Sequence, residues 1–375
     1  MPGGRRAVRT ALSWVGVGLL LLAARATTAS EFLFQPPVPT RNFAPLQLLF
    51  LNPPFEHAAT LPAGELALLL QTAESSIIAT SQGRIDATLK FEQNRTDFGA
   101  RYAVLEGWEL GLDLPFISRY GGFLDPAIDW VERVFGAENP ERSLFKDNTF
   151  GGYVVAQNDQ VFLDAGRAAF EPGDLVLSVK HGLDLPRAWP RLALRGAIKF
   201  PTGDPDKALG SGEPDFGAGL AADYQPWSRL MLYGNVNLVY PVGPITSACL
   251  TLNPIVTESF AAHLALSRRW TAMLHQATYT SPFHAGAALL DGTVVELGLG
   301  LGWAWDERFG AQLLAIQNMS GVEQSADFTI MLALQWAPWA KPTTLPDVGP
   351  PLPHAVAPPA ADSSAPLPPV GPPTP

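Results

Sequence analysis

The histidines and the cysteine are the residues whose chemistry can be judged first from their spacing. The chain has six histidines and one cysteine, Cys249, and no histidine stands in a metal-binding spacing such as His-Glu-x-x-His. His263 shares a predicted strand with Ser259 and Ser267, the combination of base and nucleophile that a hydrolase needs. Residues four apart on a strand are separated by ~13 Å, which is too far for a hydrogen bond. We therefore expect no catalytic site, no metal site and no cofactor.

Carboxylates also gather around the segments KFPTGD (199–204) and GSGEPDFGAGL (210–220). Asp204, Asp206 and Asp215 could bind calcium, but Leu209 stands where an EF-hand loop requires glycine. The prolines and glycines of these segments suit a corner between a strand and a loop. We expect a loop-shaping role in preference to a calcium site.

Other charged residues recur at alternate positions within apolar segments. Successive side chains of a strand point to opposite faces, so these charges would share one face, which in a membrane barrel lines the interior. The candidate lumen-lining residues are Arg101, Lys180, Arg195, Lys199, Asp215, Asp223, Glu296 and Asp327, with Asp86, Glu109 and Asp113 as further acidic candidates. They could line a water-filled path, or form a buried network of ion pairs if the interior is blocked.

These charges must be positioned by strands, and apolar and polar residues alternate throughout the middle of the chain. Residues 326–336 and 292–305 place apolar side chains on one face and small or polar ones on the other. A soluble β-sandwich would also alternate. Short connections between strands alternate with long ones, which favours an all-β transmembrane antiparallel barrel over the soluble sandwich. Aromatic residues near strand ends, Trp303, Trp305 and Trp336, are predicted girdle or assembly residues.

The predicted number of strands is 12 to 14. The candidate strands are 65–75, 84–93, 97–105, 108–118, 149–158, 174–184, 191–201, 214–225, 229–241, 256–267, 270–281, 292–305, 308–318 and 326–336. The uncertainty lies in 149–158. If this segment is a barrel strand, the preceding insert falls on the periplasmic side; if it belongs to an extracellular hairpin, the count drops and the insert lies outside.

The insert 119–148 contains one predicted short helix, 126–135. Asp125 is a suitable N-cap, Pro126 a suitable first helical residue and Gly136 a suitable stop. We interpret it as a surface or interfacial helix in preference to a gating lid.

The two ends of the chain differ from the barrel region 63–340. Arginines followed by an apolar stretch make residues 1–29 a predicted signal peptide, which directs the protein to export and, with the barrel, to the cell outer membrane. Residues 30–62 carry phenylalanines and prolines and could enter the lumen as a plug. Residues 341–375 contain 13 prolines in 35 residues and should form an extended or disordered tail, whose periplasmic partner, if any, is unknown.

Composition agrees with an exported barrel. The chain is 47% hydrophobic and 16% charged, and its formal charge of −10 argues against nucleic acid as a partner. The expected partners are outer-membrane lipid, the barrel-assembly machinery and small solutes.

Two stretches resemble a known family. YGGFLDPAIDWVERVFGAENPER (Tyr120–Arg142) and RNFAPL (Arg41–Leu46) are similar to an uncharacterised family of Gram-negative outer-membrane proteins, known as a domain of unknown function. KFPTGD and GSGEPDFGAGL resemble a signature of related barrels, some linked to aromatic-compound degradation and transport. The resemblance implies the fold and assigns no activity.

These observations favour passive passage of small solutes, hydrophobic or aromatic ones included, across the outer membrane. The alternative is an occluded structural or envelope-scaffold barrel without transport, and a barrel-embedded hydrolase comes third.

Overall fold

The computed structural model describes residues 32–82, 85–135, 140–157, 160–186, 189–243, 252–285, 287, 289–320 and 324–337. The predicted signal peptide, the proline-rich tail and Cys249 lie outside the described residues.

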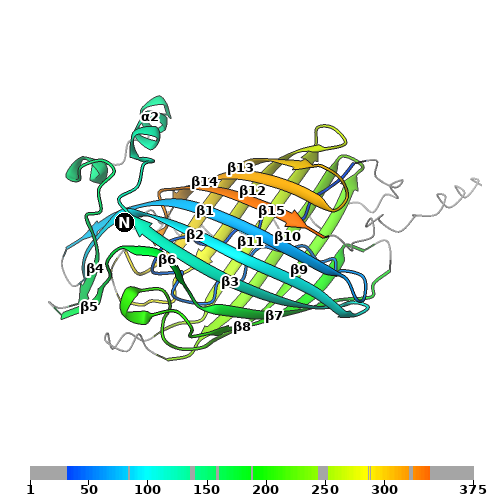
Figure 1. The fold of residues 1–375 in the computed structure, drawn as a ribbon, viewed down its shortest axis with the longest axis horizontal. Helices are drawn as coiled ribbons and strands as arrows, with labels where there is room; N and C mark the ends of the chain where they lie inside the picture. Colours follow the sequence, from blue (N-terminus) through cyan, green and yellow to red (C-terminus); the bar gives the residue numbers. More distant parts are fainter. Residues whose placement is uncertain are drawn as a thin grey trace, which may run out of the picture.

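Among the described residues, twelve antiparallel strands close into a barrel (Figure 1). Each strand pairs with the next along the ring, and β1 pairs with β15 from Leu68 to Ser76, which closes it. The ring consists of β1 (Leu66–Ser81), β2 (Ile85–Leu105), β3 (Trp108–Tyr120), β7 (Leu175–Gly182), β8 (Arg191–Phe200), β9 (Asp215–Trp227), β10 (Leu230–Pro241), β11 (Ile255–Ala265), β12 (Trp270–Thr280), β13 (Thr293–Ala304), β14 (Phe309–Ser320) and β15 (Phe328–Trp336).

Alternation decides which way each side chain points. Along β15, Ile330 and Leu332 are exposed on the outside, whereas Met331 and Ala333 are fully buried inside. The same pattern along the other strands makes the outer surface apolar, as in membrane barrels, and places polar side chains in the lumen.

Most connections sort by length at the two ends of the barrel; the short link from β1 to β2 and the eight-residue link from β7 to β8 are exceptions. Short turns join β2 to β3, β9 to β10, β11 to β12 and β13 to β14 at one end, which we call the short-turn end. Connections of about a dozen residues join β8 to β9, β10 to β11 and β12 to β13 at the opposite, long-loop end.

An insert lies between β3 and β7 at the long-loop end. It contains α2 (Asp125–Phe135), η1 (Pro140–Leu144), β4 (Gly152–Gln157), β5 (Gln160–Asp164) and β6 (Ala168–Pro172). In Figure 1, α2, β4 and β5 lie beyond the end of the barrel. The predicted helix at 126–135 is confirmed. No described helix is long and apolar enough to cross a membrane.

The fourteen strand candidates become twelve ring strands for two reasons. The candidates 84–93 and 97–105 are one continuous strand, β2. The candidate 149–158 corresponds to β4. This strand pairs with Ile85–Lys90 of β2 on one side and with β5 on the other, and it stays outside the ring. The lower number of the predicted range is therefore correct, and the insert lies with the long loops.

Candidate functional site

Residues 32–62, which we call the N-terminal segment, run inside the barrel. The ascending limb (32–44) starts at the short-turn end, where the Leu33 amide donates to the carbonyl of Arg268 between β11 and β12. The tip (45–51) reaches the long-loop end. The return limb (52–62) descends to the start of β1, and the Leu61 amide donates to Glu109 near the start of β3 (2.9 Å). The segment therefore spans the height of the lumen twice.

Carboxylates of the wall accept hydrogen bonds from the segment's backbone. Asp215 at the start of β9 accepts from the Leu51 amide (2.7 Å). Asp223, eight residues further along β9, accepts from the amides of Ala58 (2.8 Å) and Ala59 (3.2 Å). A carboxylate that accepts backbone N–H bonds replaces the water that an irregular segment would otherwise need. These acids therefore fix the end of the tip and the return limb against β9.

Basic residues of the wall bind the segment's carbonyls. Lys199 on β8 donates to the carbonyl of Leu49 (2.7 Å) and pairs with Asp174 and Asp215. Arg195, four residues earlier on β8, donates to the carbonyl of Pro54 (2.9 Å). The spacing of four residues on β8 thus matches the descent of the chain from the tip into the return limb.

Glu56 is the charged contact that the return limb supplies itself. Its carboxylate lies 2.8 Å from Arg101 of β2 and 3.5 Å from Arg195. Asn235 on β10 accepts from the Glu56 amide (3.0 Å) and donates to the Glu56 carbonyl (2.7 Å), so both backbone groups and the side chain of this residue are bound.

Burial and charge set the protonation of two neighbouring segment residues. Burial by itself raises the pKa of Glu56, but the Arg101 and Arg195 guanidinium groups outweigh it and hold the pKa below its usual value. Burial and, after it, the ammonium of Lys180 lower the pKa of His57 well below its usual value. The docked segment therefore carries an ionised Glu56 and a neutral His57.

Amide and phenol side chains hold the ascending limb. Gln35 donates to the carbonyl of Trp303 (2.6 Å), and its own carbonyl accepts from the Tyr233 hydroxyl (3.0 Å). Gln312 on β14 donates to the carbonyl of Pro36 (2.8 Å). The ascending limb is thus bound by residues of β10, β13 and β14.

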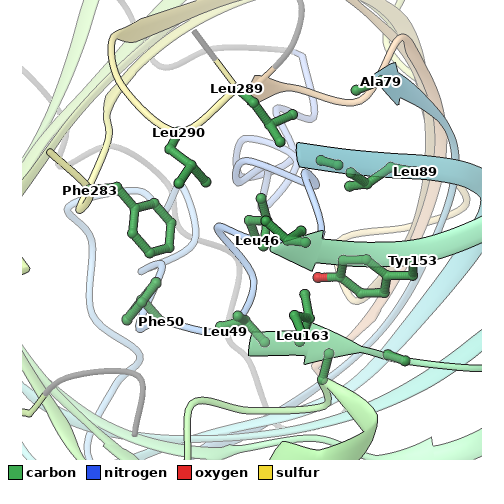
Figure 2. Close-up of a cluster of buried hydrophobic side chains, with 14 of the residues drawn as sticks. Leu46, Leu49, Phe50, Ala79, Leu89, Tyr153, Leu163, Phe283, Leu289 and Leu290 are labelled. Atoms are coloured by element: carbon green, nitrogen blue, oxygen red, sulfur yellow. The ribbon is translucent and has the colours of Figure 1, made fainter. Parts of the chain in front are cut away.

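The tip packs into a buried apolar cluster at the long-loop end (Figure 2). Leu46, Leu49 and Phe50 lie among side chains of β2, the insert and the connection between β12 and β13. The wall partners drawn in Figure 2 include Leu89, Tyr153, Leu163, Phe283, Leu289 and Leu290. Each such side chain stabilises the closed arrangement by about 1.5–3 kcal/mol when fully buried.

Little space remains between the segment and the wall around Pro53 and Pro54. A cavity of about 10 Å³, room for about one water molecule, lies between Pro53 and Pro54 of the segment and the small residues Ala197, Gly217 and Gly219 of β8 and β9.

The predicted lumen residues fall into two groups. Arg101, Arg195, Lys199, Asp215 and Asp223 contact the segment directly, and Lys180 pairs with Glu109, which also binds it. Glu296 is buried on β13. Asp327 precedes β15 at the long-loop end, where it pairs with Arg142 of η1 (3.2 Å).

Sequence reasoning missed the polar residues that bind the segment without carrying a charge, above all Asn235 and Gln312. The signal was present for Asn235, because Asn235 and Asn237 alternate with apolar residues in β10 and both are buried. It also missed Glu56, and Arg41, whose Nη1 lies 3.8 Å from Asp97 of β2. Nothing in an irregular stretch tells which side chains will face a distant strand.

His263 does not lie beside a serine hydroxyl. Its Nε2 is 3.1 Å from the Nε2 of His275 on β12, and its ring packs edge-on against Tyr233. In the described part of the chain, no group of three or more His, Cys, Asp or Glu side chains is placed to hold a metal ion.

The KFPTGD and GSGEPDFGAGL segments build the corner between β8 and β9. Asp174 accepts from the Gly203 amide (2.9 Å) and pairs with Lys199. A Cβ at Gly210 would lie 2.3 Å from the Asp174 carboxylate, and one at Gly203 would lie 2.4 Å from the carbonyl of Leu209. Both glycines are therefore required by close approach, and Asp204 caps the 3₁₀ turn η2 (Pro205–Lys207).

The predicted girdle aromatics lie on the outside at the short-turn end. Trp303 stacks between Trp270 and Trp305, and Trp336 ends β15 half-exposed.

The barrel resembles solved outer-membrane proteins. An outer-membrane channel from Pseudomonas putida F1 matches with a TM-score of 0.50 and 12% identity, over 74% of this chain and 97% of that chain. The NanC porin matches with a TM-score of 0.43 and 6% identity, over 72% and 98%. The P. putida toluene transporter TodX gives 0.35 and 9%, over 74% and 90%. Identities this low concern the fold alone. No curated protein matches the sequence.

A family match covers most of the chain. The family described as "Protein of unknown function (DUF3187)" matches residues 17–337, which include both stretches that carried the resemblance in the sequence. The resemblance to an uncharacterised barrel family is thereby confirmed. Since the match spans well over half of the sequence, the chain belongs to the DUF3187 family of proteins of unknown function.

Proposed function

We propose that this protein is an outer-membrane channel for small solutes, closed by its own N-terminal segment acting as a plug. The apolar exterior supports a place in the membrane, and the likeness to the Pseudomonas putida F1 channel supports the fold that such channels use. Passage then requires the plug to move, because the segment fills the lumen.

The observation that carries the proposal is the chemistry of the plug contacts. A permanent core is usually apolar, since buried ion pairs add little net stability over well-packed apolar residues. Here the middle of the lumen is polar, with Glu56 between Arg101 and Arg195 and Asp223 under two backbone amides. These wall groups can exchange the plug for water or for a polar solute group when the plug leaves.

The expected solutes are small molecules with an apolar part. The mouth at the long-loop end is apolar, and the charged groups of the wall lie below it. The apolar or aromatic part of such a solute would contact the apolar mouth, and its polar group would contact the charged groups of the wall.

A disulfide between plug and wall tests the proposal. A Cβ at Gly310 would lie 3.3 Å from Cγ of Gln35, close to the separation of a Cβ and the sulfur across a disulfide, so Gln35→Cys with Gly310→Cys should join the ascending limb to β14. Both changes are made in the Cys249→Ser background, and the signal-free protein is refolded into liposomes.

We expect liposome swelling with sugars, amino acids and small aromatic compounds in the reduced protein and none in the oxidised one. The two single-cysteine variants are the matched controls and should not respond to oxidant. Equal swelling with and without the disulfide would contradict a moving plug.

The alternative is an occluded barrel that serves as an envelope structure. The two passes of the N-terminal segment through the lumen, with a cavity of only about 10 Å³ beside Pro53 and Pro54, favour it. It predicts that neither the wild type nor the reduced variant swells the liposomes. Heat-modifiable migration of the protein in gel electrophoresis should still show a folded barrel in both.

A further inference from the structure

Glu56 is a carboxylate that the plug itself places between two arginine side chains of the wall. Its Oε1 accepts from Nε (3.2 Å) and Nη2 (2.8 Å) of Arg101, and its Oε2 lies 3.5 Å from Nη2 of Arg195. Asn235 binds both backbone groups of the same residue. The planar guanidinium group presents its N–H donors in the geometry that carboxylate oxygens accept. The closed protein therefore contains a carboxylate position that is complete in its contacts.

Withdrawal of the plug leaves Arg195 without a carboxylate partner. Among the described residues, Glu56 is the acid that pairs with Arg195, whereas Arg101 also pairs with Asp113 (3.1 Å). The carbonyl of Pro54, which accepts from Nη2 of Arg195 (2.9 Å), leaves with the same segment. The other partners of this guanidinium group are neutral side-chain amides of β10. An unpaired guanidinium group in the lumen attracts an anion from solution.

The plug also fills room for an apolar group beside this position. The cavity of about 10 Å³ is lined by Glu56, Arg195 and Pro53. At Gly217 of β9, a Cβ would lie 2.9 Å from Cδ2 of Leu51 and 3.6 Å from Cγ of Pro53. The absence of a side chain at Gly217 therefore makes the space that these two plug residues occupy. When the plug leaves, this space and the carboxylate position open together.

We propose that the lumen binds the carboxylate of a small organic acid at the position that Glu56 occupies in the closed protein. The apolar body of the acid takes the place of Leu51 and Pro53 beside Gly217. The inference rests on the proposed channel, because the acid reaches this position when the plug moves. It assigns the solutes as monocarboxylic acids with an apolar body. An acid that binds the undocked state alone shifts the equilibrium toward that state, so the solute favours the opening of its own channel.

A space made by substitution tests the carboxylate position without plug movement. Glu56→Ala removes Cγ, Cδ and both carboxylate oxygens, a group with the size and shape of acetate. The full-length mature protein is refolded in detergent micelles with sodium acetate, with acetamide as the uncharged probe of the same shape, or with sodium chloride at equal ionic strength. The readout is the thermal unfolding midpoint at increasing probe concentration. Glu56→Gln is the matched variant, because it loses the charge and keeps the space filled.

We expect acetate to raise the unfolding midpoint of Glu56→Ala with saturation and to leave Glu56→Gln and the wild type unchanged. Acetamide and chloride should bind Glu56→Ala at least about tenfold more weakly, because one lacks the charge and the other lacks the two oxygens. Adding Arg195→Gln to Glu56→Ala should weaken acetate binding by a similar factor. Adding Arg133→Gln, at an exposed position of α2, should have no effect on it.

Three results would overturn the site: acetate without effect on Glu56→Ala, an equal effect of acetate on Glu56→Gln, or acetamide or chloride as effective as acetate. Arg195→Lys keeps the charge and loses the planar donors, so its acetate affinity should be intermediate. This variant decides the role of Arg195 if Arg195→Gln fails to fold.

Planar bilayers test the same position in the wild-type protein, and they decide the question if Glu56→Ala does not fold with any probe. Benzoate should increase the frequency of channel openings, benzyl alcohol should not, and Arg195→Lys should reduce the response to benzoate. Openings that benzoate leaves unchanged would contradict the assigned solute class and keep the channel. Acetate binding to Glu56→Ala, with no openings of the wild type under any condition, would contradict the channel and keep the carboxylate position.

Discussion

Single residues hold the plug through its backbone more than through its side chains. Asp215, Asp223 and Glu109 accept from segment amides, while Lys199 and Arg195 donate to segment carbonyls. Backbone groups are present at nearly every residue, so this kind of contact puts little demand on the segment's side chains. Glu56 and His57 are the places where protonation enters.

Acid should release the plug, first through His57. The docked form keeps the pKa of His57 well below its usual value of ~6.5, so the undocked form binds more protons below that pH. Docking is therefore strongest above pH ~6.5 and weakens as the pH falls. Glu56 acts in the same direction below its usual ~4.3, because its docked pKa is lowered.

Swelling rates of wild-type liposomes measured from pH 8 to pH 5 should rise on acidification, and His57→Gln should remove most of this rise. His284→Gln, at an exposed position, is the control. A pH profile that His57→Gln leaves unaltered would show that this histidine does not control the plug.

At the scale of elements, the insert is joined to the barrel by buried ion pairs. Asp125 at the start of α2 pairs with Lys90 of β2 and Arg142 of η1, and it accepts from the Asn148 amide. Glu92 of β2 accepts from the amides of Phe123 and Leu124, just before α2. The short helix therefore has a fixed attachment on the outside of β2.

Asp125→Ala should detach the insert without opening the barrel. It leaves Lys90 and Arg142 without this partner, and breaking a buried pair costs about 3–5 kcal/mol. We expect faster protease cleavage between residues 121 and 150, with heat-modifiable migration retained. Lys146→Ala, at an exposed position of the insert, should cleave like the wild type. Unchanged cleavage in Asp125→Ala would mean that these pairs do not hold the insert.

The continuity of β2 shows why a strand pattern can be misread. Residues 93–97 are polar on both faces, which in the sequence resembles a turn. In the structure Arg95 and Asp97 face the lumen, while Asn94 and Thr96 face outward and bond to Thr72 and to each other. Outward polar residues interrupt the alternation without ending the strand.

For the whole molecule, the ring and the plug are separate sources of order. The ring closes through backbone pairing of β1 with β15 and needs no plug residue. Removing residues 32–62 should therefore leave a folded barrel with a wider lumen. It should unfold at a lower temperature, since the apolar cluster loses Leu46, Leu49, Phe50 and Leu51.

This deletion should raise the swelling rate above that of the wild type at every pH, with folding checked by heat-modifiable migration. Deletion of residues 341–375 is the control and should change neither property. A deleted barrel that folds and does not swell would place the block elsewhere in the lumen.

The sequence by itself determined the all-β antiparallel barrel and the short helix, and it predicted a common face for the charged residues. Alternation has a period of two residues and is therefore a local property, legible in any nine residues such as Phe328–Trp336. The helix at α2 was likewise readable from its cap, its proline and its glycine. The sequence could not distinguish charges that line an open, water-filled lumen from charges buried in a filled one, because both arrangements place them on the same face of the strands.

Only the tertiary structure decided what fills the lumen. The contacts of the segment join residues up to 276 positions apart, as between Pro36 and Gln312, and no local pattern encodes such a pairing. The same holds for β4, whose alternation suits a ring strand but whose partner is the projecting end of β2. Which wall groups each carboxylate binds follows from where distant chain segments meet.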